Sequence, residues 1–139
     1  MVQLIVGKKG KGKSKHILDK VNSEVKNVLG SIVYLDKSTK HMYELNNKVR
    51  LIDVSQCLID NNDEFIGFVA GIISQDHDLQ QMYFDSFLKI AHLEDADITP
   101  TIQKLEKFSE AFHLDFVLSV SMDESELPDS VKDKVIVSL

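Results

Sequence analysis

The sequence predicts a three-layer α/β fold, with a mainly parallel sheet of five or six strands and helices on both faces. Two observations predict it. Short β-branched segments alternate along the chain with segments whose apolar residues recur at helical spacing, which is the order that builds parallel sheets. The strand segments are also apolar along their length, as strands buried on both faces are. The chain has 139 residues with no internal repeat and no linker, so residues 1–139 are expected to form a single domain.

The first part of the chain is expected to alternate strand and helix. Apolar residues at helical spacing predict a helix from Lys13 to Val28, with Gly30 as its C-terminal cap. Short, β-branched apolar segments predict buried strands on either side of it. These strands cover residues 2–6, 31–36 and 49–54.

A second helix is predicted from Asp63 to Ser74. It is apolar on most sides, so we expect other elements to cover it. Gly67 and Gly71 have the spacing found where helices pair in membranes. The longest strongly apolar run, residues 65–73, is far shorter than the ~20 residues of a membrane span. We therefore expect no membrane span, and both glycines are expected to allow close packing of this helix on the sheet.

The second half of the chain continues the alternation. A polar loop, residues 92–99, leads to Pro100, which suits the first turn of a helix with an apolar stripe from Ile102 to Phe112. A short helical segment is expected from Pro128. The remaining strands are predicted over residues 81–87, 115–121 and 135–139.

Positive charge is concentrated at the start of the chain. The net charge is −6, yet the first 15 residues contain five lysines and no acid. An acidic body argues against a surface that coats nucleic acid, which requires a basic face. The lysines therefore require a local explanation.

The cysteine and histidine residues do not predict a metal site. Cys57 is the single cysteine, which excludes an internal disulfide and a cysteine-based zinc site. We expect it to be a buried structural thiol in a cytoplasmic protein. The histidines are scattered without metal-binding spacing, and most are expected at the surface. They are His16, His41, His77, His92 and His113.

The lysine-rich segment contains a phosphate-binding motif. Residues 7–14, GKKGKGKS, match G-x-x-x-x-G-K-[ST] at every fixed position, between a predicted strand and a predicted helix. Glycines permit positive φ, so that backbone N–H groups can surround phosphate oxygens, and the helix directs its positive end at the same anion. Lys13 would bridge the β- and γ-phosphates, and the Ser14 hydroxyl would ligate Mg²⁺. The expected binding residues are Gly7, Lys8, Lys9, Gly10, Lys11, Gly12, Lys13, Ser14 and Lys15.

Through this motif the chain resembles the P-loop (Walker-type) NTPase superfamily. The resemblance implies a P-loop NTPase-like fold, a bound Mg²⁺–nucleotide, and an acid at the end of an apolar strand that holds the Mg²⁺ shell. Asp85 is the best match for this acid. Asp36 and then Asp53 are its rivals, because each also follows an apolar strand. The resemblance thus implies Lys13 and Asp85 as catalytic residues, and Ser14 and Asp85 as metal ligands.

The sequence departs from the hydrolysing members of that superfamily. Many of them have a glutamate after the strand-end aspartate, where it orients the attacking water, but Ser86 stands at this position. Glu64 is an outside candidate for a replacement base. Arg50 is the single arginine, and a surface or ion-paired role is expected for it rather than that of an arginine finger. Ser121 loosely fits the position of a residue that faces the γ-phosphate. Fast hydrolysis of ATP is therefore not expected.

The nucleotide is expected to be ATP. Residues 47–50, NKVR, begin like the guanine-recognition motif N-K-x-D but lack its aspartate. The arginine-rich lid of small-molecule kinases is missing. The glycines of the loop also do not form the dinucleotide motif G-x-G-x-x-G.

Over its whole length the chain resembles a group of short bacterial proteins that are often labelled ATP-binding or twitching-motility-ATPase-like. It lacks the partner domain, the histidine-rich box and the arginines of a motor. The resemblance is therefore taken to imply nucleotide binding and nothing of motility.

Two hypotheses of function follow from these observations. The first is a small cytoplasmic ATP-binding P-loop protein, an NTP hydrolase with weak or partner-stimulated activity. The second is a non-enzymatic binding module or nucleotide-sensing switch, whose loop binds a phosphate-bearing partner such as RNA. Lys8, Lys9 and Lys11 motivate the second, because the motif does not require lysine at these positions. RNA affinity that falls steeply with salt would favour it.

Overall fold

The computed structural model describes residues 1–139 and contains a single sheet of six parallel strands. The predicted fold class is therefore confirmed. The order of the strands across the sheet is β3-β2-β4-β5-β1-β6. Their bounds are β1 Val2–Val6, β2 Ser31–Asp36, β3 Val49–Asp53, β4 Leu79–Phe84, β5 Asp115–Val120 and β6 Val135–Ser138.

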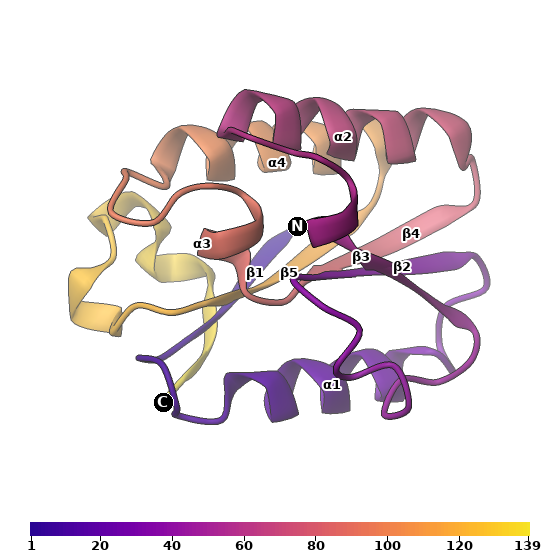
Figure 1. Ribbon diagram of the computed structural model, residues 1–139, viewed down its shortest axis with the longest axis horizontal. Helices are drawn as coiled ribbons and strands as arrows, with labels where there is room; N and C mark the ends of the chain where they lie inside the picture. The colour runs from indigo at the N-terminus through magenta and orange to yellow at the C-terminus, as the bar shows by residue number, and fades with distance from the viewer.

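Helices cover both faces of the sheet and complete the three layers. Helices α2 and α4 lie on one face and α1 lies on the other (Figure 1). None of the helices is long and apolar enough to cross a membrane. The helices are α1 Lys13–Glu24, α2 Asn62–Gln75, α3 Phe87–Ile90 and α4 Thr99–Phe112, with 3₁₀ helices η1 Val54–Gln56, η2 Glu124–Glu126 and η3 Asp129–Lys134.

The two faces of the sheet are buried in two apolar clusters. In the larger one, Leu4 and Phe84 pack with residues of α2 and α4. In the smaller one, Ile5 and Tyr83 pack with α1 residues such as Ile17. Because successive strand residues point to opposite faces and both faces are covered, the strands are apolar along their length.

Helix α1 is shorter than predicted. It ends at Glu24 rather than Val28, and Gly30 is not its cap. The N–H of Gly30 donates to Gln80 Oε1 at 2.6 Å, and a Cβ added to Gly30 would lie 2.0 Å from the carbonyl oxygen of Asp78. Gly30 is thus required by a close approach of two backbone segments at the start of β2.

The expected packing role of Gly67 and Gly71 is wrong. Both glycines are exposed on α2, and nothing lies within 4 Å of a Cβ added to either. The helix is buried along one stripe only, so its high apolar content does not mean that it is covered on most sides. The buried residues of this stripe are Phe65, Val69, Ile72 and Ile73.

Several smaller details also differ from the predictions. Strand β4 begins two residues earlier than predicted and ends at Phe84, and the short helix α3 that follows was not predicted. Pro100 lies in the first turn of α4 as predicted, although the helix begins at Thr99. Cys57 is half-buried rather than buried, and its Sγ donates to the carbonyl oxygen of Asp53 at 3.6 Å.

The contrast between two glycines gives a test of this fold. Gly30→Ala is expected to lower the free energy of unfolding by about 1–3 kcal/mol, because the added methyl group meets backbone that must move. Gly67→Ala is expected to raise it by about 0.5–1 kcal/mol, because the methyl group enters open space and alanine favours the helix. Urea denaturation of both variants measures these values. Equal effects of the two substitutions would contradict the described environments.

Candidate functional site

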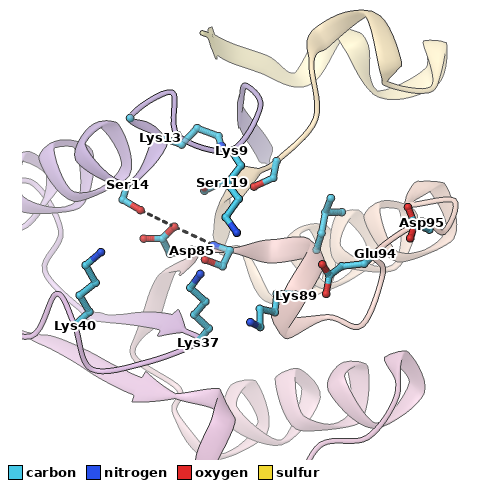
Figure 2. A pocket seen from close by; sticks show the side chains of 15 residues that line it. Lys9, Lys13, Ser14, Lys37, Lys40, Asp85, Lys89, Glu94, Asp95 and Ser119 are labelled. Carbon is cyan, nitrogen blue, oxygen red and sulfur yellow. Dashed lines mark hydrogen bonds between the residues drawn. The ribbon is translucent and has the colours of Figure 1, made fainter.

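A cavity of about 600 Å³ lies at the carboxyl edge of the sheet. The register of the strands explains why, since Ile5 of β1 pairs with Ser119 of β5, and Leu118 pairs with Phe84 of β4. The loops that follow these strands therefore emerge side by side. Figure 2 shows the side chains that point into the space between them. The lining residues are Lys9, Gly10, Gly12, Lys13, Ser14, Lys37, Lys40, Asp85, Ser86, Leu88, Lys89, Glu94, Asp95, Ser119 and Ser121.

The glycine-rich loop between β1 and α1 forms one wall of the cavity. Gly10 and Gly12 have φ values of +86° and +91°, in the left-handed region where glycine is strongly favoured. Gly12 directly precedes α1, and no side chain accepts a hydrogen bond from the first turn of this helix. The N–H groups of that turn are thus free to bind an anion.

Lys13 supplies a buried cation to this wall. Its side chain is 7% exposed, and Nζ donates to the carbonyl oxygen of Lys8 at 3.1 Å across the loop. Burial lowers the pKa of the Lys13 ammonium below its usual value, and the charge of Asp85 opposes this shift. An anionic ligand would relieve the cost of burying the charge.

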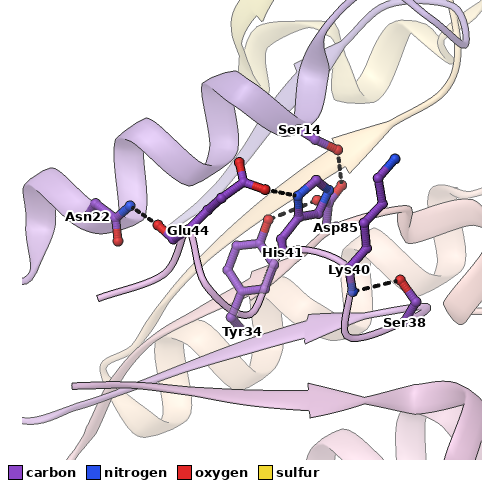
Figure 3. A network of polar contacts seen from close by, with 8 residues as sticks. All are labelled: Ser14, Asn22, Tyr34, Ser38, Lys40, His41, Glu44 and Asp85. Atoms are coloured by element: carbon purple, nitrogen blue, oxygen red, sulfur yellow. Dashed lines mark hydrogen bonds and ion pairs between the residues drawn. The ribbon is translucent and has the colours of Figure 1, made fainter. Parts of the chain in front are cut away.

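Asp85 lies opposite the loop and is held by several hydrogen bonds. Ser14 Oγ donates to Asp85 Oδ1 at 3.3 Å, and the N–H of Ser86 donates to the same oxygen at 2.9 Å. The hydroxyl of Tyr34 donates to Asp85 Oδ2 at 2.8 Å (Figure 3). Burial, and then the charge of Asp85, raise the pKa of Tyr34. The carboxylate is therefore positioned beside the residue that would ligate Mg²⁺.

The strand order separates the three aspartates that the sequence proposed for the metal. Asp85 follows β4, which lies two strands from β1, whereas Asp53 ends β3, four strands and about 19 Å from β1. Asp53 instead accepts hydrogen bonds from the N–H and hydroxyl of Ser55 at the start of η1. Asp36 lies between these extremes, directly beside Asp85, because Leu35 pairs with Phe84.

Asp36 is a second buried carboxylate in the site. It is 2% exposed, its Oδ1 accepts the N–H of Lys37 at 2.7 Å, and its Oδ2 is buried with no hydrogen-bond partner. Burial, and then the negative charge of Asp85, raise the pKa of Asp36 from 3.8 to about 6. The folded protein therefore holds a proton on this group up to a higher pH than the unfolded chain does.

This raised pKa predicts a dependence of stability on pH. Between pH 4 and pH 6 the folded state retains a proton that the unfolded state has lost, so Asp36 lowers stability as pH rises through this range. Asp36→Asn removes this penalty. The stability of the variant relative to wild type should therefore be higher at pH 7.5 than at pH 4, by up to about 3 kcal/mol. Urea denaturation at both pH values, with a chelator present, measures the difference. If the stability of the variant relative to wild type were the same at pH 4 and pH 7.5, the pKa of Asp36 would not be raised in the folded protein.

The structure brings most of the predicted loop residues to the cavity. The loop residues that line it are Lys9, Gly10, Gly12, Lys13 and Ser14. Asp85, Ser119 of β5 and Ser121, which comes directly after β5, line it as well. Other residues of the predicted set lie outside the lining, and the binding and catalytic roles of the whole set remain predictions. Those outside the lining are Gly7, Lys8, Lys11 and Lys15.

Two residues considered for hydrolysis lie away from the cavity. Glu64 is at the start of α2, where its Oε1 accepts the N–H of Asp60 at 2.7 Å, and it does not line the cavity. Arg50 is on β3 and pairs with Asp76 at 3.5 Å. Its ion-paired position agrees with the role expected for it.

Several residues of the cavity were not predicted from the sequence. Lys37 and Lys40 come from the loop after β2, Lys89 comes from α3, and Glu94 and Asp95 follow α3. One signal could have identified Lys37, because it directly follows a strand-end aspartate and the ends of parallel strands share an edge. The others depend on loop paths that no sequence pattern specifies.

The comparisons with known proteins support the fold. No family model matches the sequence, and no curated protein matches it. The structure is similar to that of the flagellar accessory protein FlaH from Methanocaldococcus jannaschii, with a TM-score of 0.62 and 14% sequence identity. The match covers 94% of this chain and 64% of the FlaH chain, so this chain spans less than two thirds of that protein. At this identity the likeness shows the fold alone.

Proposed function

We propose that this chain binds a Mg²⁺–nucleotide, with ATP as the expected ligand, and hydrolyses it weakly or when a partner stimulates it. The observation that carries the proposal is the hydrogen bond between Ser14 and Asp85 in a cavity that Lys13 also lines. A hydroxyl, a buried carboxylate and a buried ammonium thus meet at the end of a glycine-rich loop. These are the groups that a nucleotide triphosphate with its cation requires.

The size and charge of the cavity support this ligand. A volume of about 600 Å³ lies within the ~300–1,000 Å³ of small-molecule sites. Five lysines and three acids line it, whereas the whole chain has a net charge of −6. The local excess of positive charge favours a polyanion such as a triphosphate.

Ser14 and Asp85 fit a magnesium ion. Mg²⁺ prefers hard oxygen ligands, and it is usually held by one or two protein oxygens together with phosphate oxygens. Asp85 is 2% exposed and is oriented by Tyr34 and Ser86, so its carboxylate is already fixed toward Ser14. The ion would neutralise phosphate charge, while Lys13 and the backbone of the loop would orient the phosphates.

The set of residues around the cavity favours slow hydrolysis. Ser86 follows Asp85 where a water-orienting glutamate stands in many hydrolases, and the other lining acids, Glu94 and Asp95, are exposed. Lys37 and Lys89 line the side of the cavity opposite the glycine-rich loop (Figure 2), so they are candidates to stabilise phosphate charge in place of an arginine. A partner that completes the site would raise the rate.

Calorimetry with ATP, ADP and AMP in the presence of Mg²⁺ tests this function. Because the loop is expected to bind the β-phosphate, ATP and ADP should bind at least tenfold more tightly than AMP. Phosphate release should be slow and should require Mg²⁺. Equal affinity for the three nucleotides, or no binding of any of them, would contradict the proposal.

The alternative of an RNA-binding loop has one supporting observation. Lys8 and Lys11 are exposed and lie outside the lining of the cavity, where they could meet a phosphate-bearing partner. However, both also influence Asp123. Hydrogen bonds from Ser125 are the main cause of the lowered pKa of Asp123, and the charges of Lys8 and Lys11 add to it. Binding of labelled RNA that weakens steeply with salt would favour the alternative.

A further inference from the structure

Two buried carboxylates face each other beside the nucleotide cavity, and neither is paired with a lysine or arginine. Asp36 and Asp85 are each 2% exposed, and one oxygen of each lies within 4.8 Å of the other. Neither forms an ion pair with a lysine, although Lys37 directly follows Asp36. Two like charges at this separation are costly to bury unless a proton or a cation lies with them.

A histidine completes this group. A ring nitrogen of His41 also lies within 4.8 Å of both carboxylates, and its side chain is largely buried. The Nδ1 atom of His41 is paired with Glu44 Oε1 at 2.9 Å, which leaves Nε2 free (Figure 3). A carboxylate on one ring nitrogen is the usual arrangement when the other nitrogen ligates a metal, because it fixes the tautomer and the ring orientation.

The loop that carries His41 is attached to α1. The side chain of Asn22 donates from Nδ2 to the carbonyl oxygen of Glu44 at 2.8 Å, and its Oδ1 accepts the N–H of Asn46 at 2.8 Å. Both contacts hold the loop between β2 and β3 against the helix. The position of His41 beside Asp85 is therefore supported on two sides, by Glu44 and by Asn22.

We propose that Asp36, His41 and Asp85 bind a divalent transition-metal ion. The Oδ2 atom of Asp36, buried and without a partner, is an independent sign that a ligand belongs there. One imidazole and two carboxylates suit ions such as Zn²⁺, Co²⁺ or Mn²⁺, whereas Mg²⁺ prefers oxygen ligands alone. Ligand atoms around such an ion lie about 3–4 Å apart, so only a small contraction of the group is required.

This site is distinct from the proposed magnesium site but shares one residue with it. Ser14 belongs only to the proposed Mg²⁺–nucleotide site, Asp36 and His41 belong only to the transition-metal site, and Asp85 contacts both groups. The metal would neutralise the carboxylate pair and hold the loop of Lys37 and Lys40 at the edge of the cavity. The transition-metal ion is expected to bind without nucleotide.

Titration of the full chain with Zn²⁺ alone, by calorimetry and without nucleotide, tests the proposal. We expect one tight equivalent of metal, and a Co²⁺ absorption spectrum typical of mixed nitrogen and oxygen ligands. His41→Gln and Asp36→Asn should each weaken binding by more than tenfold, and Glu44→Gln by about tenfold. His41 lies in a loop, so His41→Gln keeps the test valid if Asp36→Asn fails to fold.

Matched variants separate this proposal from nucleotide binding. His77→Gln replaces an exposed histidine outside the group and should leave Zn²⁺ affinity unchanged. Ser14→Ala should retain Zn²⁺ binding and weaken Mg²⁺–ATP binding. His41→Gln should weaken Zn²⁺ binding and retain Mg²⁺–ATP binding. Absence of Zn²⁺ binding, or binding that survives both His41→Gln and Asp36→Asn, would overturn the metal site and would leave the proposed nucleotide site untouched.

Discussion

Lys13→Ala is expected to lower the affinity for Mg²⁺–ATP by about 100-fold. The ammonium of Lys13 is buried at the loop and points across it, so its loss removes a charged hydrogen-bond donor from a site poorly exposed to water. Hydrogen bonds to charged groups contribute about 1.5–3 kcal/mol, and 1.4 kcal/mol corresponds to a factor of ten in affinity. Isothermal titration calorimetry at fixed Mg²⁺ measures the change.

Lys15→Ala is the matched control for this variant. Lys15 was among the residues expected to bind from the sequence, but it is exposed on α1 and lies outside the lining of the cavity. Its removal therefore changes the net charge equally and is expected to leave the cavity intact. We expect its effect to stay within about threefold, the size of a surface-charge contribution of less than 1 kcal/mol. Equal losses of affinity in the two variants would show that general charge, rather than the position of Lys13, attracts the nucleotide.

Asp85→Asn is expected to abolish the dependence of ATP binding on Mg²⁺ and to lower any hydrolysis by about 10²–10³-fold. The amide keeps the shape and one acceptor oxygen of the side chain but loses the negative charge that faces Ser14. Binding of ATP should be measured with and without Mg²⁺, and phosphate release at saturating ATP. If Asp85→Asn kept the wild-type ratio between ATP affinity with Mg²⁺ and ATP affinity without it, Asp85 would not be a ligand of the Mg²⁺ ion.

Asp53→Asn is the control for this second variant. Asp53 also lies at the carboxyl end of a strand of the same sheet, but this strand is at the far edge, and Asp53 accepts a hydrogen bond from Ser55. The Asp53→Asn variant should therefore leave the Mg²⁺ dependence of ATP binding and the rate of hydrolysis unchanged. Circular dichroism and urea denaturation show whether Asp85→Asn retains the fold, since Tyr34 and Ser86 both donate to Asp85.

The sequence predicted the architecture well because its main signals are local. Buried parallel strands are apolar along their length, so β1, β2 and β5 were located almost to the residue. The end of α1 was less predictable, because Val25 and Val28 continue the apolar spacing after the helix has ended. The backbone contact that requires Gly30 involves Asp78, 48 residues away, and no local pattern indicates it.

The candidate site was predictable where a motif or a strand end marks it. The loop of residues 7–14 has a strict spacing, Asp85 follows β4, and Asp36 is the last residue of β2. Their separation from Asp53 depends on the order of strands across the sheet, which the sequence did not specify. His41 was expected at the surface among scattered histidines. Its place beside Asp85 depends on a long loop that Asn22 holds, and such contacts have no periodic signal.

The central claim is that the loop of residues 7–14 and Asp85 form one Mg²⁺–nucleotide site. A crystal structure of the protein grown with Mg²⁺ and a non-hydrolysable ATP analogue tests it most directly. We expect the β-phosphate to lie within the loop, Lys13 to contact the phosphates, and one Mg²⁺ to lie between the Ser14 hydroxyl and Asp85. A nucleotide bound elsewhere on the chain, with the loop free of phosphate, would show that residues 7–14 and Asp85 do not form this site.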